Sequence, residues 1–320
     1  MTHHADAIAS EGSAWAMVPG ATIWSYRIDD VPAGSADIRV VTISKDDQHW
    51  ERIFTFPNLE ELTLHGPDQK QLAAMSRLHS LARLRIISAR PKDLSFVSEM
   101  SNLGELSLEY VSGFSDLAPL RQLKKLRLLH LENLRGVTDF HGLSGIESLM
   151  YLSMSGTTDW NQPVADFSFL KGLPNLEVLS LSWLTSKSTF PALMPIVSLK
   201  KLRTLRIGRR DFPINEYALL EAGLPGVAGA AWRPSLRHAY RHLPLPPDAI
   251  EADHPSVRIN PYGERVIDDP DSYWYDFLGK GDRSIRCAGP QAEKKRAEYD
   301  QAYEAMKQDA LLRISASGPA

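Results

Sequence analysis

Apolar residues recur in this chain at a spacing that neither a helix nor a strand explains. From Asp116, in the stretch DLAPLRQLKKLRLLHL, they stand at offsets 1, 4, 7, 10, 13 and 15. A helix places apolar residues three and four apart and a strand places them two apart, so a run of threes that ends in a two fits neither. The stretch therefore predicts two elements, a tight turn with side chains aligned at every third residue and then a short strand.

The same spacing recurs along the chain, and such repeats decide a fold before any single element does. Copies with identical offsets begin at Asp93, Asp139 and Asp166, and copies with a different first residue begin at His49, Gln71 and Ala192. The leucine at the tenth offset advances by 22, 22, 23, 23, 27 and 26 residues from copy to copy. Residues 38–43 add half a copy in front, and residues 227–232 add a degenerate copy behind. Seven copies predict a solenoid of about eight parallel strands.

The recurring L-x-x-L-x-L, preceded by a second L-x-x-L-x-x run, resembles the leucine-rich repeat family. It is most similar to the short repeats of about 22 residues found in internalins and phosphatase regulators, and the resemblance covers about residues 38–232. The resemblance implies an α/β fold: a right-handed horseshoe with a parallel β-sheet on its concave face and short 3-10 or helical turns on its convex face.

Two polar columns of the repeat bear on the turns. Asp93, Asp116, Asp139 and Asp166 stand where a carboxylate accepts hydrogen bonds from a helical first turn, so we expect them to cap the convex turns. The family's asparagine, three residues after the last strand leucine, is absent. Those positions hold Pro67, Ala89, Val111, Leu134, Thr157, Leu184 and Arg210. Its absence leaves the turn geometry open but not the solenoid.

The ends of the chain are expected to cover the ends of the solenoid, because an array of repeats exposes a core face at each end. We expect a flexible N-terminus over 1–20, a cap and first strand over 21–48, the solenoid over 49–235 and a C-terminal appendage over 236–320. Trp24, Tyr26 and Ile28 alternate, which predicts a β-hairpin cap over 21–44. In the appendage, the stretches SYWYDFLG and RSIRCAG predict two strands, and Pro290 starts a predicted helix that carries an apolar stripe.

Composition sets the class of protein. The formal net charge is −3 and charged residues make up 23%, so no overall field favours nucleic acid or an anionic membrane. There is one cysteine, no long apolar run and no basic head before an apolar segment at the N-terminus. We therefore expect a monomer in the reducing cytoplasm, without a membrane span or an intrachain disulfide.

The concave face is the expected binding surface, since strand residues beside the core leucines point out of it. Aromatic and arginine side chains among small polar ones are typical of protein interfaces. The candidate contact residues are Arg85, Glu109, Tyr110, His130, Tyr151, Trp160, Trp183 and Arg206. The other interpretation of the aromatic residues is that they pack between neighbouring repeats. The extra residues of the two longest repeats are either further contact loops or tolerated insertions.

The remaining motifs predict neither a catalytic site nor a metal site. Cys287 falls in a predicted strand, where a lone cysteine is usually a small packed hydrophobe. His238 and His242 stand four apart, with His254 nearby, and are expected on a solvated helix face rather than as metal ligands. We expect no enzyme activity, cofactor or metal, and another protein as the partner. Two alternatives stay open: an enzyme or secreted effector active in the appendage, and an immunity protein that neutralises a toxin.

Overall fold

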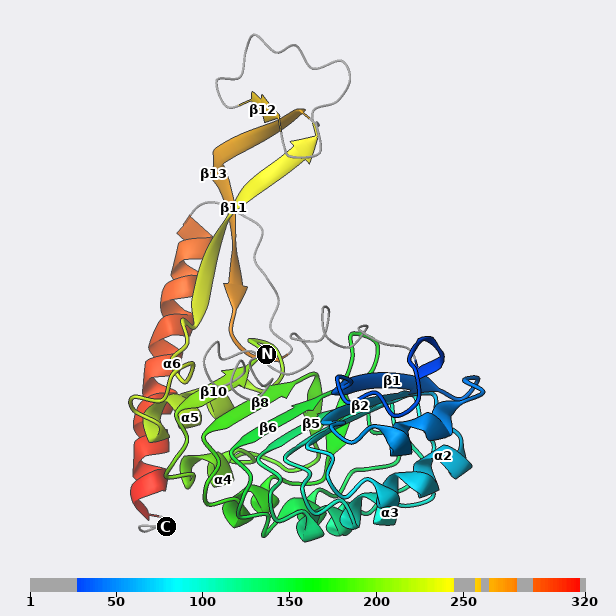
Figure 1. Ribbon diagram of the computed structural model, residues 1–320. Helices are drawn as coiled ribbons and strands as arrows, with labels where there is room; N and C mark the ends of the chain where they lie inside the picture. Colours follow the sequence, from blue (N-terminus) through cyan, green and yellow to red (C-terminus); the bar gives the residue numbers. More distant parts are fainter. Residues whose placement is uncertain (1–27, 245–256, 260–264, 281–289, 317–320) are drawn as a thin grey trace. The chain divides into compact units, whose positions relative to one another are not determined.

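The main sheet of the molecule is open and has eight parallel strands. A computed structural model describes residues 28–244, 257–259, 265–280 and 290–316 (Figure 1). The strands follow chain order, with two numbers missing where a small second sheet intervenes. They are β1 (Val40–Ser44), β2 (Glu61–His65), β3 (Arg83–Ile87), β4 (Glu105–Glu109), β5 (Leu128–Glu132), β6 (Tyr151–Ser155), β8 (Val178–Ser182) and β10 (Thr204–Ile207). The predicted leucine-rich repeat solenoid, with one strand per repeat, is confirmed.

Short turns lie on the other side of this sheet from its concave face (Figure 1). Most are 3-10 turns or single helical turns, in which side chains three apart align toward the core. They are η2 (Ile28–Asp30), η3 (Trp50–Thr55), α2 (Gln69–Ala74), η4 (Met75–Arg77), α3 (Ser95–Ser98), η5 (Ala118–Gln122), η6 (His141–Leu143), η7 (Ser168–Gly172) and α4 (Met194–Val197). The spacings of three therefore come from the turns, and the final spacing of two comes from the strand.

Nearly every apolar position of the repeat is buried; Ile207 on the last strand is only partly buried. In the copy that starts at Asp116, all six repeat leucines are at most 2% exposed. The missing asparagine column is filled by apolar side chains, because Ala89, Val111, Leu134 and Leu184 are also at most 2% exposed. The side chain of Gln162 makes turn hydrogen bonds of the kind that the family's asparagine makes. Its side chain accepts a hydrogen bond from Leu134 N at 2.9 Å and donates one to Val137 O at 2.7 Å.

The repeat aspartates bond to the turns as expected, but from one residue earlier than an N-cap. The carboxylate of Asp116 accepts from Ala118 N at 2.8 Å, while the N-cap of η5 is Leu117. Asp93, Asp139 and Asp166 make the same bond, each to the N–H two residues on and each at 2.8 Å. Each aspartate thus forms an Asx-type turn that leads the chain into the helical turn.

The two longest repeats form a second, two-stranded sheet beside the main one. Its strands β7 (Gln162–Val164) and β9 (Leu184–Ser186) are parallel. Gln162 N donates to Trp183 O at 2.8 Å, so the insertion in one repeat is bonded to the next. The extra residues are therefore part of the fold and hold the loop that contains Trp160.

By its internal contacts the chain divides into two compact units. The second unit contains Pro213–Gly223 and the chain from Ala231 onward. Its elements are α5 (Ile214–Gly223), β11 (Ser235–Pro244), β12 (Val257–Ile259), β13 (Arg265–Phe277) and α6 (Pro290–Ala316). The strands form an antiparallel sheet in the order β11-β13-β12, and α5 packs against α6. Tyr303 is fully buried and donates to Glu221 at 2.7 Å, a bond that ties the two helices together.

Two details of the predicted ends are wrong within the described residues. The expected strand residue Ile28 instead starts a 3-10 turn; Trp24 and Tyr26, the other alternating residues of the predicted hairpin, lie outside the described residues. In the appendage, the SYWYDF strand pairs with β11, which is the HAYRH segment that was expected to be helical. The sequence of this segment is compatible with either a helix or a strand. Pairing with β13, about 30 residues further along the chain, makes it a strand. Cys287 and RSIRCAG lie outside the described residues.

Candidate functional site

The residues that directly follow strands β2 to β6 and β8 form one column, which we call the strand-end rim. Its members are Gly66, Ser88, Tyr110, Asn133, Gly156 and Trp183. All but Gly156 have φ between 52° and 59°, the left-handed region. The N–H groups of the first five members extend the ladder: Tyr110 N, for example, donates to Glu132 O at 2.9 Å. Trp183 N instead donates to the side chain of Asp211 at 3.1 Å. The backbone conformation is therefore imposed by the stacking of the repeats.

Tyrosine and tryptophan are unusual occupants of such positions. The left-handed conformation costs a residue with a Cβ about 1–2 kcal/mol, and glycine or asparagine accepts it more readily. The rim uses glycine where space demands it: a Cβ on Gly156 would lie 2.3 Å from Trp160 O. Tyr110 and Trp183 nevertheless remain 48% and 46% exposed. Neither local conformation nor complete burial accounts for these two aromatic side chains.

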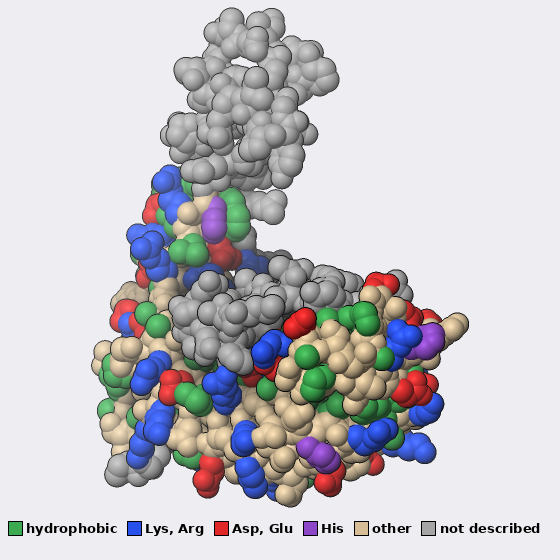
Figure 2. Space-filling view, in the orientation of Figure 1, with side chains coloured by type: hydrophobic (Ala, Val, Ile, Leu, Met, Phe, Trp, Pro, Cys, Tyr) green, Lys and Arg blue, Asp and Glu red, His purple; other side chains and the backbone are tan. Residues whose placement is uncertain are grey.

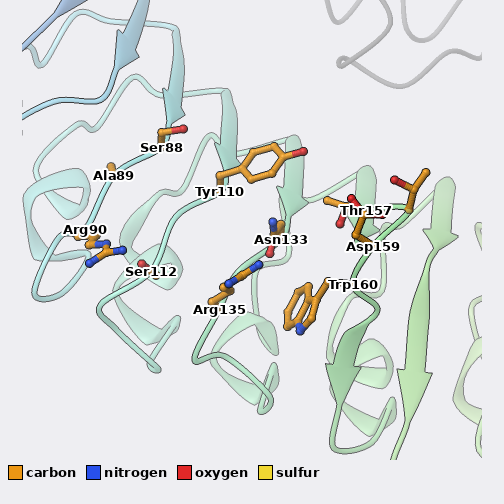
Figure 3. A pocket seen from close by; sticks show the side chains of 11 residues that line it. Ser88, Ala89, Arg90, Tyr110, Ser112, Asn133, Arg135, Thr157, Asp159 and Trp160 are labelled. Atoms are coloured by element: carbon orange, nitrogen blue, oxygen red, sulfur yellow. The ribbon is translucent and has the colours of Figure 1, made fainter.

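A groove runs along the rim and encloses about 460 Å³. Figure 3 shows Ser88, Tyr110, Asn133 and Thr157 following one another at the strand ends, with Arg90, Ser112, Arg135 and Trp160 in a second row. The groove, which we call the rim groove, is lined by these residues together with Ala89, Thr158 and Asp159. Two of the predicted contact residues, Tyr110 and Trp160, are thus brought together although 50 residues separate them.

Asn133 is the buried polar group of the rim groove. It is 5% exposed, and its Oδ1 has no hydrogen-bond partner. Its backbone is fully used, since Asn133 N donates to Ser155 O at 2.9 Å and Asn133 O accepts from Arg135 N at 3.1 Å. A buried carbonyl oxygen without a donor costs about 1–3 kcal/mol. The groove therefore offers an acceptor that the fold itself leaves unused.

The ionisable groups of the rim groove have a positive balance. Arg90, Arg135 and Asp159 are all exposed. The Arg135 guanidinium lies over the Trp160 ring, 5.8 Å from its centroid, in a cation–π arrangement. Partial burial raises the pKa of Tyr110, and the nearby carboxylate of Glu132 raises it further. The tyrosine hydroxyl is therefore neutral at physiological pH and able to donate a hydrogen bond.

Arg85 and Glu109, also predicted contact residues, are engaged with each other on the concave face. Two hydrogen bonds of 2.6 Å join the guanidinium to the carboxylate, and Ser107 Oγ donates to the same carboxylate at 2.7 Å. The two side chains are only 12% and 8% exposed. Their strong groups are therefore satisfied within the fold, and they offer a partner little surface.

The remaining predicted residues of the concave face are mostly buried. His130 is 2% exposed and its Nε2 lies 3.6 Å from Glu132 Oε2, an approach that lowers the pKa of Glu132. Tyr151 is 5% exposed, and its burial raises the pKa of its hydroxyl to about 12. Arg206 is half-buried on β10. These residues form the floor beside the rim rather than its exposed surface.

Sequence reasoning missed Asn133, Arg135 and Arg90, although the repeat register contains the signal for them. The rim stands at offset 17 of each repeat, and Arg90, Ser112 and Arg135 stand at offset 19. Counting two residues beyond the last strand leucine would have placed Tyr110, Asn133 and Trp183 in one column. What the register does not show is which member of the column is exposed.

One cluster on the convex turns has the order of a catalytic triad. His141 Nδ1 lies 2.7 Å from Asp139 Oδ1, and His141 Nε2 lies 2.7 Å from Ser168 Oγ. The Ser168 hydroxyl, however, also bonds to Asp166, and the imidazole is about half exposed. These groups clip two neighbouring turns together on an open surface. His238, for its part, stacks on the Trp274 ring at 4.4 Å between centroids.

The described residues contain neither a candidate metal site nor a candidate membrane span. They contain no group of three or more His, Cys, Asp or Glu side chains placed to hold a metal ion. None of their helices combines the length and the apolar character that a membrane span requires.

Comparison with known proteins finds partial similarity to several solved structures. No family model and no curated protein matches the chain. Among solved structures it is similar to an internalin, InlF, of Listeria monocytogenes, with 21% identity over 53% of this chain and 49% of that one, and a TM-score of 0.43. It is also similar to internalin C2 of the same organism, with 23% identity, 48% and 62% coverage and a TM-score of 0.36. A leucine-rich repeat protein of Leptospira interrogans follows, with 19% identity, 54% and 55% coverage and a TM-score of 0.35.

The chain spans about half the length of the InlF structure and less than two thirds of internalin C2. The assignment of the fold therefore rests on the repeats themselves. Seven copies of one apolar spacing form eight parallel strands, with short turns on the opposite side. The chain is therefore a leucine-rich repeat solenoid, built from short repeats of 22 to 27 residues.

Proposed function

We propose that this chain is a non-enzymatic protein-binding module whose main contact surface is the strand-end rim. The observation that carries the proposal is the pair of half-exposed aromatic residues, Tyr110 and Trp183, in left-handed backbone positions. Glycine or asparagine would serve the fold better there. A role outside the fold, in contact with another molecule, explains why bulky side chains occupy these sites.

The chemistry of the rim supports a protein as the partner. Interface energy is concentrated in a few aromatic and arginine anchors that are surrounded by small polar groups. The strand-end rim carries Tyr110 and Trp183. The rim groove adds Trp160, several hydroxyl side chains and two exposed arginines. Acidic and basic side chains are intermixed over the described residues on the face seen in Figure 2, which favours a neutral protein surface over a polyanion.

The concave face belongs to the proposal as the floor next to the rim. The buried positions of Glu109, His130 and Tyr151 leave a partner little of their side chains to contact. Arg206, on the last strand, is the predicted concave residue that retains appreciable exposure together with a positive charge. The partner we expect therefore rests against the strand ends and reaches onto the sheet.

The test compares glycine variants of the rim with a convex control. Tagged wild-type protein, the double variant Tyr110→Gly/Trp183→Gly and Lys171→Ala are used to capture proteins from a lysate of the source organism. We expect a stoichiometric partner with wild type and Lys171→Ala that the double variant loses, by at least about thirtyfold in affinity when measured with the purified partner. Glycine suits the backbone at both sites, so the double variant should keep a cooperative melt. A partner that binds the double variant normally would contradict the proposal.

A further inference from the structure

The two arginines of the rim groove have no acidic partner in the fold. Within the described part of the chain, no carboxylate lies within ion-pairing distance of Arg90 or Arg135. The other arginines of this region differ: Arg85 is bound to Glu109 at 2.6 Å, and Arg83 is bound to Glu61 at 2.8 Å. Guanidinium groups pair preferentially with planar carboxylates through two parallel hydrogen bonds. The groove therefore presents two available carboxylate-binding groups.

The fold anchors the backbone of both arginines and, at Arg135, the side chain as well. Arg135 is stacked on Trp160, and its N–H is bonded to Asn133 O. The carbonyl of Arg90 accepts a hydrogen bond of 2.7 Å from the Gln69 side chain. Both arginines stand at offset 19 of their repeats, with Ser112 of the intervening repeat between them. Since neighbouring parallel strands lie about 4.8 Å apart, two repeats separate their backbones by roughly 10 Å.

That separation matches an extended peptide. An extended chain advances about 3.3 Å per residue, so side chains three residues apart stand roughly 10 Å apart. A segment that runs across the repeats would place one acidic side chain at Arg90 and a second at Arg135. Between them its backbone would pass Tyr110 and Ser112 of the intervening repeat, and beside Arg135 it would reach Asn133, whose Oδ1 lacks a donor. A backbone N–H of the segment would supply one, after a small rotation of the asparagine amide.

We propose that the rim groove binds an extended, acidic segment of the partner protein, with two Asp or Glu residues three apart paired to Arg90 and Arg135. The proposal rests on the protein-binding function given above and names its chemistry. Tyr110 and Trp160 provide apolar faces against which the residues between the acids pack. Asp159, on the same groove, repels a uniformly anionic polymer and so favours a peptide in which acidic and neutral residues mix.

The test uses a display library of random twelve-residue peptides, selected on the full-length wild-type protein at low salt. We expect the selected peptides to contain acidic pairs three residues apart more often than the starting library does. Binding of a synthetic selected peptide is then measured by fluorescence anisotropy. Arg135→Gln should weaken it at least about tenfold, as should Asn133→Gly, which suits the left-handed backbone. Lys171→Gln removes the same charge from a convex turn and should have no effect.

Peptide variants identify the source of the carboxylates. Changing the two acids to Asn and Gln should abolish binding, whereas amidation of the C-terminus should leave it unchanged. Selected peptides without acidic pairs, no selection at all, or equal binding to wild type and Arg135→Gln would overturn the proposal. If, in addition, Tyr110→Gly/Trp183→Gly still loses its protein partner, the protein-binding function stands and only the acidic segment is wrong. If the peptide predictions fail and the double variant also keeps its protein partner, the protein-binding function is contradicted as well.

Discussion

The guanidinium of Arg85 on β3 and the carboxylate of Glu109 on β4 are joined by two parallel hydrogen bonds of 2.6 Å, across a sequence separation of 24 residues. Such bidentate pairs are the strong form of the ion pair. With side-chain exposures of 12% and 8%, the pair is largely shielded from water. Loss of this ion pair should therefore be felt in the stability of the solenoid.

Removing one partner of this pair should destabilise the solenoid. Glu109→Ala leaves the Arg85 guanidinium buried without its carboxylate, and we expect a loss of about 2–4 kcal/mol in the free energy of unfolding. The double variant Arg85→Met/Glu109→Leu should recover most of this loss, since it leaves no uncompensated charge. Urea unfolding measures both. Equal losses in the single and double variants would mean that the pair matters only through packing.

The repeat core should be sensitive to truncation. Leu129 on β5 is fully buried, and Leu129→Ala should cost about 2–5 kcal/mol because it removes apolar contact and leaves a cavity. The exposed Lys124 donates only to the carbonyl of Arg121, so Lys124→Ala should change the unfolding free energy little. Thermal and urea melts of the two variants check the register. Similar stability losses in both would contradict it.

The Asx-type turns should contribute to stability and not to binding. Asp116 bonds to Ala118 N at 2.8 Å, and Asp116→Ala should cost about 0.5–2 kcal/mol, the range of a lost capping bond. Asp116→Asn keeps an acceptor oxygen and should lose less. Partner capture by Asp116→Ala should equal that of wild type. Loss of partner capture at unchanged thermal stability would assign the repeat aspartates a role in binding rather than in stability.

Acid should weaken the convex clip between neighbouring turns. Hydrogen bonds from His141 lower the pKa of Asp139, and the Ser168 hydroxyl lowers the pKa of Asp166, in both cases from the usual 3.8. A carboxyl whose pKa is lowered by folding stabilises the protein above pH 3.8, and this contribution is lost as the pH falls through its folded pKa. Urea midpoints should therefore drop below about pH 4. The double variant Asp139→Asn/Asp166→Asn should show a shallower drop, whereas an unchanged slope would speak against this origin.

The left-handed rim can be tested through a comparison of alanine and glycine. Tyr110→Ala and Tyr110→Gly remove the same ring, but only alanine keeps the conformational cost at φ 56°. We expect Tyr110→Gly to be more stable than Tyr110→Ala by about 1 kcal/mol. At Ser182, inside β8, the order should reverse, because glycine weakens a strand by about 0.5–1 kcal/mol relative to alanine. The same order at both sites would refute the rim conformation.

The repeat pattern by itself determined the solenoid. Offsets 1, 4, 7, 10, 13 and 15 name both the turn and the strand, and every apolar residue so placed in the copies from Asp93 to Asp166 is buried. Repeats are predictable in this way because each one meets only its neighbours, which are copies of itself. The role of Asp116 follows as well, since its bond is local and spans two residues.

Only the tertiary structure decided what depends on contacts between distant residues. Arg85 meets Glu109 because the register of β3 and β4 aligns their strands, and Tyr110 and Trp160 line one groove because an insertion folds beside the rim. The HAYRH segment is a strand because β13 pairs with it. Burial of His130 and Tyr151, and the lack of a donor for Asn133, depend likewise on several repeats at once. A local pattern states which way a side chain points, but the neighbours that it finds there are set by the packing of the whole solenoid.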